Sequence, residues 1–358
     1  MDEAIIQALH TRNRAIIDAV IAKAEKTCPG ALDLIAVAGS FASSDFYEKS
    51  DLDLLIIIND DSGYQLAKCF ILGDVGHDIY CQTWARLEHT AGYPDPHINK
   101  LLDAEIVYCR CDTVRERYLQ LGADLRRKLE RPLDTDDLRV IRGHMNDAVQ
   151  AYGRLCLEEA PARCRCLAAD VLYRIEYAIY MLNKAYIRHG IRGIPKEICS
   201  LPLLPRDFAD HYHALIAEET VDGIRRELGW LIRQTESWIA EQEALLASKT
   251  PLTPDALRGT YEEIFSNWRN KMHRAANESN AYLSWMTAAS CQAFYDFMAN
   301  TYRISRTELF SGDLPRDLQD AAERFDAAMA HYKENYTNTG TEVCRYDNID
   351  AFVTDYLK

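Results

Sequence analysis

The sequence predicts an α+β fold, with a small mixed sheet and flanking helices at the front and an all-α helical domain behind it. Two observations lead to this prediction. Apolar, β-branched runs alternate with helical segments only up to about residue 110, and every later segment has the apolar spacing of an amphipathic helix. The run Arg-Pro-Leu-Asp-Thr-Asp at 131–136 breaks a long helix, so we expect a domain boundary near residue 130. The predicted domains are therefore 1–130 and 131–358.

The front domain is predicted from apolar spacing and turn residues. Isoleucine and leucine side chains three and four residues apart predict a first helix, which the Pro29-Gly30 turn ends. The predicted elements, in order, are a helix over 3–25, a strand over 32–38, a short helix over 41–46, a strand over 51–58, a helix over 64–72, strands over 77–84 and 105–109, and a helix over 114–129.

The rear domain is predicted to contain successive amphipathic helices separated by Gly- and Pro-rich breaks. These helices cover about 136–158, 163–188, 206–217, 219–247, 254–277, 279–303 and 315–335. The segment 335–340 is polar and is expected to be a loop, and 349–357 is expected to form a last short element.

Two aspartates one residue apart open the second predicted strand. Alternate side chains of a strand share a face, so Asp51 and Asp53 should point the same way while Leu52 enters the core. Carboxylate oxygens are the ligands that Mg²⁺ prefers, with water and phosphates completing its shell. Two charges on one face of a buried strand are costly without a cation. The alternative is that Gly39-Ser40 is an ordinary turn, with Asp51 capping the strand and Asp53 exposed.

The spacing of this motif resembles a known signature. Ala38-Gly39-Ser40, ten further residues and Asp51-Leu52-Asp53 are similar to the Gly-Ser and Asp-x-Asp motif of the nucleotidyltransferase superfamily, which has a polymerase beta-like fold. The resemblance implies two Mg²⁺ ions held by Asp51 and Asp53, with ATP or another nucleoside triphosphate as co-substrate. Gly39 and Ser40 would hold the β- and γ-phosphates, since such a turn offers backbone N–H groups to an anion. Ser50 is a further candidate phosphate contact.

A third carboxylate and one missing arginine complete the comparison with this superfamily. The resemblance implies a third metal ligand from the neighbouring strand, and Asp78 is our candidate; a carboxylate that merely caps a turn is the alternative, and Asp74 competes for the role. Many relatives carry an arginine shortly after Gly-Ser, whereas this chain has Phe41-Ala42-Ser43-Ser44. Phosphate contacts would then depend on the backbone, Ser40, Ser50 or Lys49.

A second set of candidates lies on the helix predicted over 163–188. Glu176, Tyr180 and Asn183 fall within about 40° of one another beside its apolar stripe, which suits the rim of a cleft. The stretch 182–186, Leu-Asn-Lys-Ala-Tyr, also resembles a segment in the helical domain of antibiotic (kanamycin-type) nucleotidyltransferases. That resemblance implies Glu176 as the general base and Lys184 as a triphosphate contact. A solvated face with a surface ion pair is the alternative. In that group a second subunit can complete the site, so a homodimer is open.

Composition narrows the partners. The chain has 358 residues, a net charge of −14 and no long run of Lys and Arg, which argues against nucleic acid and favours a small, cationic acceptor. Eleven cysteines without an export signal indicate free thiols in the cytoplasm. The Cys-Arg-Cys triplets at 109–111 and 164–166 have too short a gap for an ordinary zinc site. No window approaches the roughly 20 apolar residues of a membrane span, so no membrane partner is expected.

The expected function is a Mg²⁺-dependent nucleotidyltransferase that moves a nucleoside monophosphate, most simply AMP from ATP, onto a hydroxyl of a small molecule and releases pyrophosphate. The resemblance suggests an aminoglycoside-like acceptor and hence antibiotic resistance. Three alternatives stay open: a protein-modifying adenylyltransferase of toxin–antitoxin type, a nucleotide cyclase of the bacterial defence type, and a non-catalytic nucleotide-binding regulatory protein.

Overall fold

A computed structural model describes residues 3–42, 46–310 and 312–358. The chain forms two compact units, Met1–Leu246 and Ala247–Lys358. No helix among the residues described is long and apolar enough to cross a membrane.

The first unit contains a four-stranded mixed sheet in the order β5-β2-β1-β6. β1 pairs antiparallel with both β2 and β6, while β5 runs parallel to β2. The strands are β1 Leu32–Val37, β2 Leu54–Ile58, β5 Cys81–Thr83 and β6 Glu105–Cys109. A separate antiparallel hairpin is formed by β3 Lys68–Leu72 and β4 Val75–Ile79. The predicted small mixed sheet is therefore confirmed.

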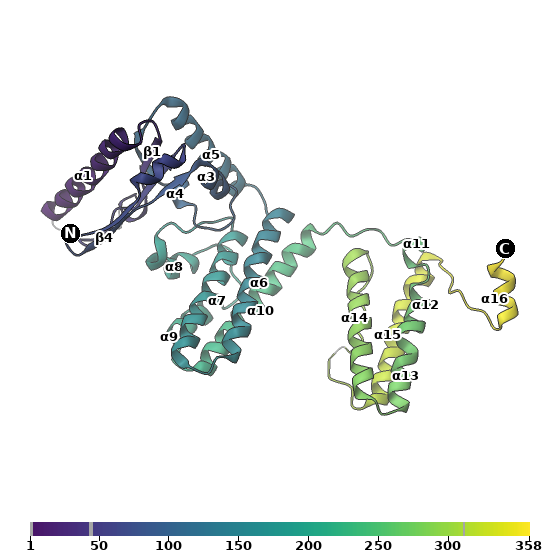
Figure 1. The fold of residues 1–358 in the computed structure, drawn as a ribbon. Coiled ribbons are helices and arrows are strands. Elements are labelled where there is room, and N and C mark those ends of the chain that lie inside the picture. Colours follow the sequence, from purple (N-terminus) through teal and green to yellow (C-terminus); the bar gives the residue numbers. More distant parts are fainter. Residues whose placement is uncertain (1–2, 43–45, 311) are drawn as a thin grey trace. The chain divides into compact units, whose positions relative to one another are not determined.

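The helices of the first unit flank the sheet and then continue as a bundle. Their bounds are α1 Glu3–Thr27, α2 Gly39–Ala42, α3 Trp84–Ala91, α4 Asn99–Leu102, α5 Asp112–Glu130, α6 Thr135–Leu157, α7 Pro161–Leu182, α8 Gly190–Ile198, α9 Phe208–Ala217 and α10 Val221–Leu246, with a 3₁₀ turn at Asp61–Leu66. α6, α7 and α10 pack on one another (Figure 1).

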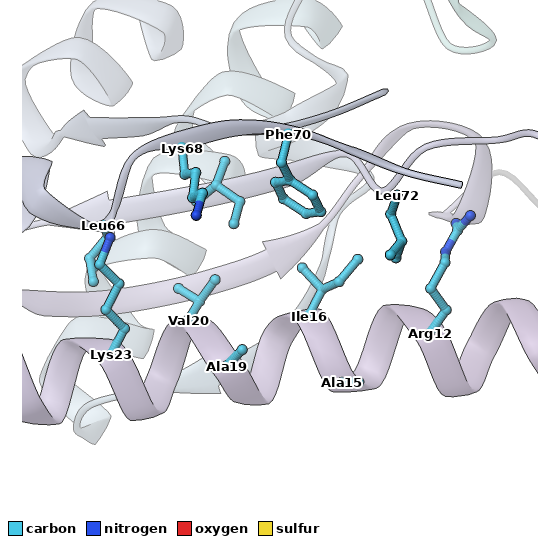
Figure 2. Close-up of a pocket in the computed structure, with 11 residues that line it drawn as sticks. Arg12, Ala15, Ile16, Ala19, Val20, Lys23, Leu66, Lys68, Phe70 and Leu72 are labelled. Carbon is cyan, nitrogen blue, oxygen red and sulfur yellow. The ribbon is translucent and has the colours of Figure 1, made fainter. Parts of the chain in front are cut away.

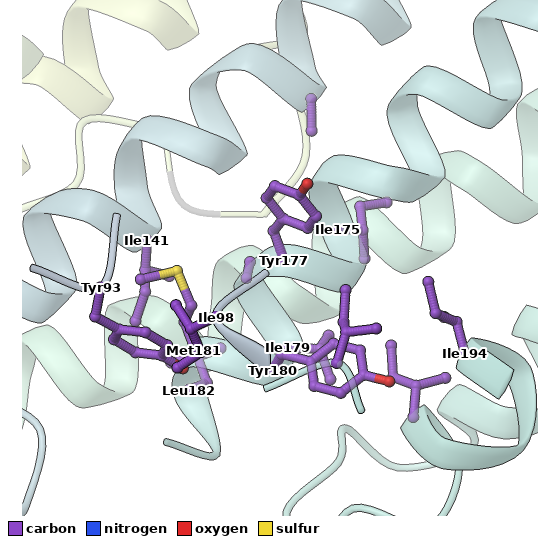
Figure 3. Packing of buried hydrophobic residues seen from close by; sticks show 14 of the residues in the cluster. Tyr93, Ile98, Ile141, Ile175, Tyr177, Ile179, Tyr180, Met181, Leu182 and Ile194 are labelled. Atoms are coloured by element: carbon purple, nitrogen blue, oxygen red, sulfur yellow. The ribbon is translucent and has the colours of Figure 1, made fainter. Parts of the chain in front are cut away.

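Alternation along β1 and β2 divides the core into two layers. Ile35 and Ile56 pack against α1, whereas Leu34 and Ile57 belong to the layer that α3 and α5 cover. This second layer runs on without a break into the bundle, where Tyr93 lies beside Ile141 and Met181 of the helices (Figure 3). The last strand ends at Cys109 and the later elements are helices, yet one core spans this change. The compact units divide at Leu246–Ala247, and a domain boundary near residue 130 stays a prediction.

Three predictions about the front elements are wrong. The segment predicted as a helix over 64–72 is a 3₁₀ turn followed by β3, because Gly73, at φ +60°, turns the chain into a hairpin with β4. The single strand predicted over 77–84 is two strands, β4 and β5, in two different sheets. The strand predicted from Asp51 begins at Leu54.

Two predictions behind the sheet are also wrong. The Gly- and Pro-containing break at 190–195 lies within α8, whose Pro195 is its sixth residue and whose buried side chains pack into the bundle. The helix predicted to end at residue 188 stops at Leu182, and Lys184 follows in the left-handed region at φ +52°.

The second unit is a small helical bundle with its own core of tyrosine, methionine and phenylalanine side chains. Its helices are α11 Pro254–Leu257, α12 Thr260–Ile264, α13 Asn270–Asn277, α14 Ala281–Thr301, α15 Leu318–Thr339 and α16 Ile349–Tyr356, with a π-helical turn at Phe265–Arg269. The helix predicted over 254–277 is thus interrupted, and the loop predicted over 335–340 belongs mostly to α15.

Candidate functional site

Asp51 and Asp53 lie at the entrance to β2, directly before the strand begins. The N–H of Ala38 donates to the carbonyl of Asp53 at 2.9 Å, which extends the β1–β2 pairing beyond the strand. Leu52 is buried in the core beneath α1, whereas Asp51 is exposed and Asp53 is half-buried. The alternation expected from the sequence is therefore present, with two carboxylates outside and one leucine inside.

Gly39 is required at its position for two independent reasons. Its φ is +64°, a backbone conformation that residues with a side chain rarely adopt. A Cβ at this position would also come within 1.9 Å of Asp53 Oδ2. The turn after β1 therefore packs directly against the carboxylate of Asp53. Ser40 follows in α2, of which the structure describes Gly39–Ala42; the expected continuation of this helix across 43–45 lies outside the described residues.

This contact makes Gly39→Ala an informative variant. We expect this variant to lose nearly all of the expected nucleotidyl-transfer activity, because the added methyl group must displace the Asp53 carboxylate. We also expect a stability loss of about 1–2 kcal/mol from the left-handed backbone. Activity and urea unfolding measure the two effects. Gly30→Ala is the matched control, since Gly30 also has positive φ (+84°) but has open space at the Cβ position. Equal activity in the two variants would contradict the role of the Gly39–Asp53 contact.

Lys100 supplies a cation to this site from α4. Its Nζ lies 3.8 Å from Asp53 Oδ1. Burial raises the pKa of Asp53, Lys100 lowers it and neighbouring Asp51 raises it again. Lys100 was not among the residues predicted for the site, because it lies between the strands predicted over 77–84 and 105–109 and reaches Asp53 only through the fold.

His77 and Arg12 hold the backbone around the two aspartates. The N–H of Leu52 donates to His77 Nδ1 at 3.4 Å, and Arg12 Nη2 donates to the carbonyl of Ser50 at 2.8 Å. Burial lowers the pKa of His77, and Arg12 lowers it further. The hydroxyl of buried Ser50 accepts the N–H of Tyr47 at 2.9 Å, so it forms part of the turn. Ser50 as a phosphate contact stays a prediction.

A mostly apolar groove lies beside His77. Phe70 stacks on the His77 ring with centroids 5.1 Å apart, and it also lines a groove of about 540 Å³ between α1 and the β3–β4 hairpin (Figure 2). Arg12, Lys23 and Lys68 are the charged side chains that line it. This lining suits an apolar group better than a triphosphate.

Asp78 lies on the other face of β4 from His77. Its side chain is exposed, and Asp78 Oδ1 lies 3.2 Å from the Cys69 Sγ on β3. Strand alternation therefore turns His77, not Asp78, toward Leu52. Over the described residues there is no group of three or more His, Cys, Asp or Glu side chains arranged to hold a metal. Asp78 as a third ligand stays a prediction that would require the hairpin to reorient.

The placement of Asp78 leads to a clear expectation. Asp78→Asn should change the Mg²⁺ concentration that gives half-maximal activity by less than about threefold, because the site depends on the opposite face of β4. A titration of nucleotidyl-transfer activity with Mg²⁺ measures this, with the unmodified protein as the reference. A loss comparable to that of an Asp51 or Asp53 variant would show that the hairpin turns Asp78 into the site.

Glu176 is buried within the helical bundle and does not lie at a cleft rim. It is 6% exposed, and the Tyr212 hydroxyl of α9 donates to Glu176 Oε1 at 2.6 Å. The sequence placed Glu176 and Tyr180 beside the core stripe of α7, but α6, α9 and α10 enclose this helix so that both are buried. Burial raises the pKa of Glu176 to about 7, and the Tyr212 hydrogen bond opposes that rise. Its role as general base stays a prediction.

Glu176 should make stability fall as the pH rises. Its pKa is raised from 4.5 to about 7 in the folded protein, so the folded state binds more protons than the unfolded state between these values. The contribution is fully present below pH 4.5 and is lost as the pH passes about 7, a change of at most about 3 kcal/mol. Urea unfolding from pH 5 to 8 measures this. The free energy of unfolding of Glu176→Gln, relative to that of the unmodified protein, should rise across this interval. If the two proteins differed by the same free energy of unfolding at every pH, the raised pKa of Glu176 would be contradicted.

Lys184 is held in a buried ion pair at the end of α7. Its Nζ lies 2.8 Å from Asp137 Oδ2, and Arg131 Nη1 lies 3.1 Å from the same oxygen. Burial lowers the pKa of Lys184, and the Asp137 hydrogen bond opposes that effect. Lys184 also lines a pocket of about 580 Å³ with Glu130 and Arg188. Its contact with a triphosphate stays a prediction, since its ammonium group is already paired.

The comparisons with known proteins are distant. No family model and no curated protein matches the chain. A crystal structure of a nucleotidyltransferase-like protein from Exiguobacterium sibiricum is 12% identical and matches over 77% of this chain and 88% of its own, with a TM-score of 0.32. At this TM-score the similarity does not define the fold or the function of this chain.

Proposed function

We propose that this chain is a Mg²⁺-dependent nucleotidyltransferase that moves AMP from ATP onto a hydroxyl of a small molecule and releases pyrophosphate. The observation that supports it most strongly is the packing of Gly39 against the Asp53 carboxylate, next to Asp51. A turn of this kind beside two carboxylates is the arrangement that the superfamily motif implies.

The residues fit a magnesium site of the kind that water and phosphate complete. Asp51 and Asp53 offer two hard oxygen donors on one side of the chain, and they would hold Mg²⁺. When bound, Mg²⁺ neutralises phosphate charge and supports an in-line displacement. Burial of Asp53 beside Asp51 disfavours two adjacent charges without a cation, which also supports a metal at this position.

The neighbouring residues would position these carboxylates and the nucleotide. Lys100 would orient Asp53 and offer a positive charge to the phosphates, a role that the absent arginine after Gly-Ser leaves open. His77 and Arg12 would hold the backbone at Leu52 and Ser50, so that the two carboxylates keep a constant separation. The backbone of Gly39-Ser40 would contact the β- and γ-phosphates.

The charges around the candidate acceptor pocket fit more than one class of hydroxylated compound. A net charge of −14 supports a cationic, aminoglycoside-like acceptor, yet the pocket beside Lys184 carries both Glu130 and Glu197 and both Arg126 and Arg188. Cationic, neutral and anionic hydroxylated compounds therefore all belong in the acceptor panel.

Incubation with α-phosphate-labelled ATP, Mg²⁺ and this panel tests the proposal. We expect pyrophosphate release and a label on a small molecule. A label on a polypeptide would support a protein-modifying adenylyltransferase instead, and a cyclic nucleotide product would support a cyclase. Absence of turnover and of Mg²⁺-dependent nucleotide binding would exclude every enzymatic version.

A non-catalytic nucleotide-binding protein is the second candidate. The specific observation in its favour is that the described residues bring only two carboxylates together at the site, without a third. Mg²⁺-dependent ATP binding by calorimetry, without pyrophosphate release in the presence of any acceptor, would support this function over the first.

A further inference from the structure

One helix of the second unit is apolar on two opposite sides. The inner side of α14 packs into the core of this unit through Cys291, Tyr295 and Met298. The outer side exposes Tyr282, Trp285 and Phe297 at 70%, 71% and 60%, and Met286 at 48%. A helix that is apolar all round is typical of a buried position, so the outer side of α14 indicates a contact surface.

Four side chains on this outer side form a row with the same kinds of residue in either direction. Trp285, Ala289, Ala293 and Phe297 are four residues apart, with an aromatic at each end and two alanines between them. Side chains spaced in this way form one ridge on a helix surface, and two such ridges pack together at about −50°. In an antiparallel pair about a two-fold axis, the alanines allow close approach at the centre, and Trp285 meets Phe297 of the partner subunit.

The surroundings of the row suit an aromatic side chain from outside. A hollow of about 380 Å³ lies beside Trp285 and Ala289, and Phe310 also lines it. The charged groups that line it are Asp296, Arg306 and Glu308, and Arg306 lies 3.1 Å from Asp296 and 4.0 Å from Glu308. Docking of an apolar side chain therefore leaves no unpaired charge buried at this point.

The available area is sufficient for a dimer. The three aromatic side chains and Met286 leave roughly 500 Å² of apolar surface on one copy, and a symmetric pair encloses about 1,000 Å² in total. This is the lower limit for a specific interface. The symmetry of the row favours a second copy over an unrelated partner, because an isologous contact requires one surface to complement itself.

We propose that α14 is a homodimer interface, in which the ridge from Trp285 to Phe297 packs antiparallel against the same ridge of a second copy of this chain. The proposal is independent of the nucleotidyltransferase function.

Sedimentation velocity of the full chain across the micromolar range tests this interface. The unmodified protein should dimerise, and Trp285→Lys and Phe297→Glu should each weaken dimerisation at least about 100-fold. The double variant Trp285→Lys/Phe297→Glu should dimerise more tightly than either single variant, because each introduced lysine then faces an introduced glutamate. Leu314→Lys is the control, since Leu314 is 86% exposed outside this row and should leave dimerisation unchanged.

The outcomes separate clearly. Loss of the dimer in both single variants with recovery in the double variant would support the antiparallel ridge. A monomer at every concentration would overturn the proposal, as would single variants that still dimerise. If both single variants lost the dimer and the double variant dimerised no more tightly than they do, the antiparallel pairing of Trp285 with Phe297 would be overturned. All the variants replace exposed side chains, and thermal unfolding checks that they fold.

Discussion

Asp53→Asn is expected to lower the rate of nucleotidyl transfer by about 10³-fold or more. The substitution replaces one of two carboxylates that would hold Mg²⁺, and a loss of about 4 kcal/mol of transition-state stabilisation corresponds to that factor. The measurement is initial-rate pyrophosphate release at saturating ATP, using the acceptor found in the panel. Asp18→Asn is the control, because Asp18 forms an exposed ion pair with Arg14 on α1 and should keep full activity.

Stability should separate this loss from misfolding. Burial and Asp51 disfavour the charged form of Asp53, so its removal should leave the unfolding temperature unchanged or slightly raised. A variant that is stable and inactive would support a metal-binding role. Full activity in both Asp53→Asn and Asp51→Asn would show that the metal assignment is wrong.

Asp137→Asn is expected to lower the free energy of unfolding by about 3–5 kcal/mol. Asp137 is 4% exposed and accepts from both Lys184 and Arg131. Its neutral replacement leaves the largely buried Lys184 without its charged partner, whereas Arg131 keeps its ion pair with Asp134. It also completes the capping box at the start of α6 with Asp134. Urea unfolding measures the change.

A neighbouring aspartate provides the matched control for this prediction. Asp136 lies in the same first turn of α6 but forms an exposed pair with Arg139, so Asp136→Asn should cost less than about 0.5 kcal/mol. Equal effects of the two substitutions would contradict the buried ion pair. Lys184→Met combined with Asp137→Asn should recover part of the stability by removing an unpaired ammonium group. A large rise in the KM for ATP in Lys184→Met alone would instead support the phosphate contact.

The motif around β2 could be predicted because its geometry is local. The spacing of Asp51, Leu52 and Asp53 needs only an extended backbone to turn two carboxylates outward and one leucine inward. The Gly39-Ser40 turn follows β1 directly in the chain. The sheet and most helices were also predictable, since periods of two and 3.6 residues are properties of short windows.

The surroundings of that motif were not predictable, because they come from distant segments. Lys100 reaches Asp53 from a short helix, and His77 reaches Leu52 because the β3–β4 hairpin replaces a predicted helix. The same hairpin turned Asp78 outward. For His77 and Asp78 the error came from pairing between strands, and for Lys100 it came from the packing of a distant helix; a single window of sequence contains neither.

The sequence alone determined the type of residue at each key position: two carboxylates after a Gly-Ser turn, a helix with a glutamate beside its apolar stripe, and a lysine near the predicted end of that helix. Only the tertiary structure decided which of these residues meet. It packed Gly39 against Asp53, enclosed Glu176 among α6, α9 and α10, and paired Lys184 with Asp137. The physical reason is that burial and charge pairing depend on which elements pack together, and that packing is decided by the whole core.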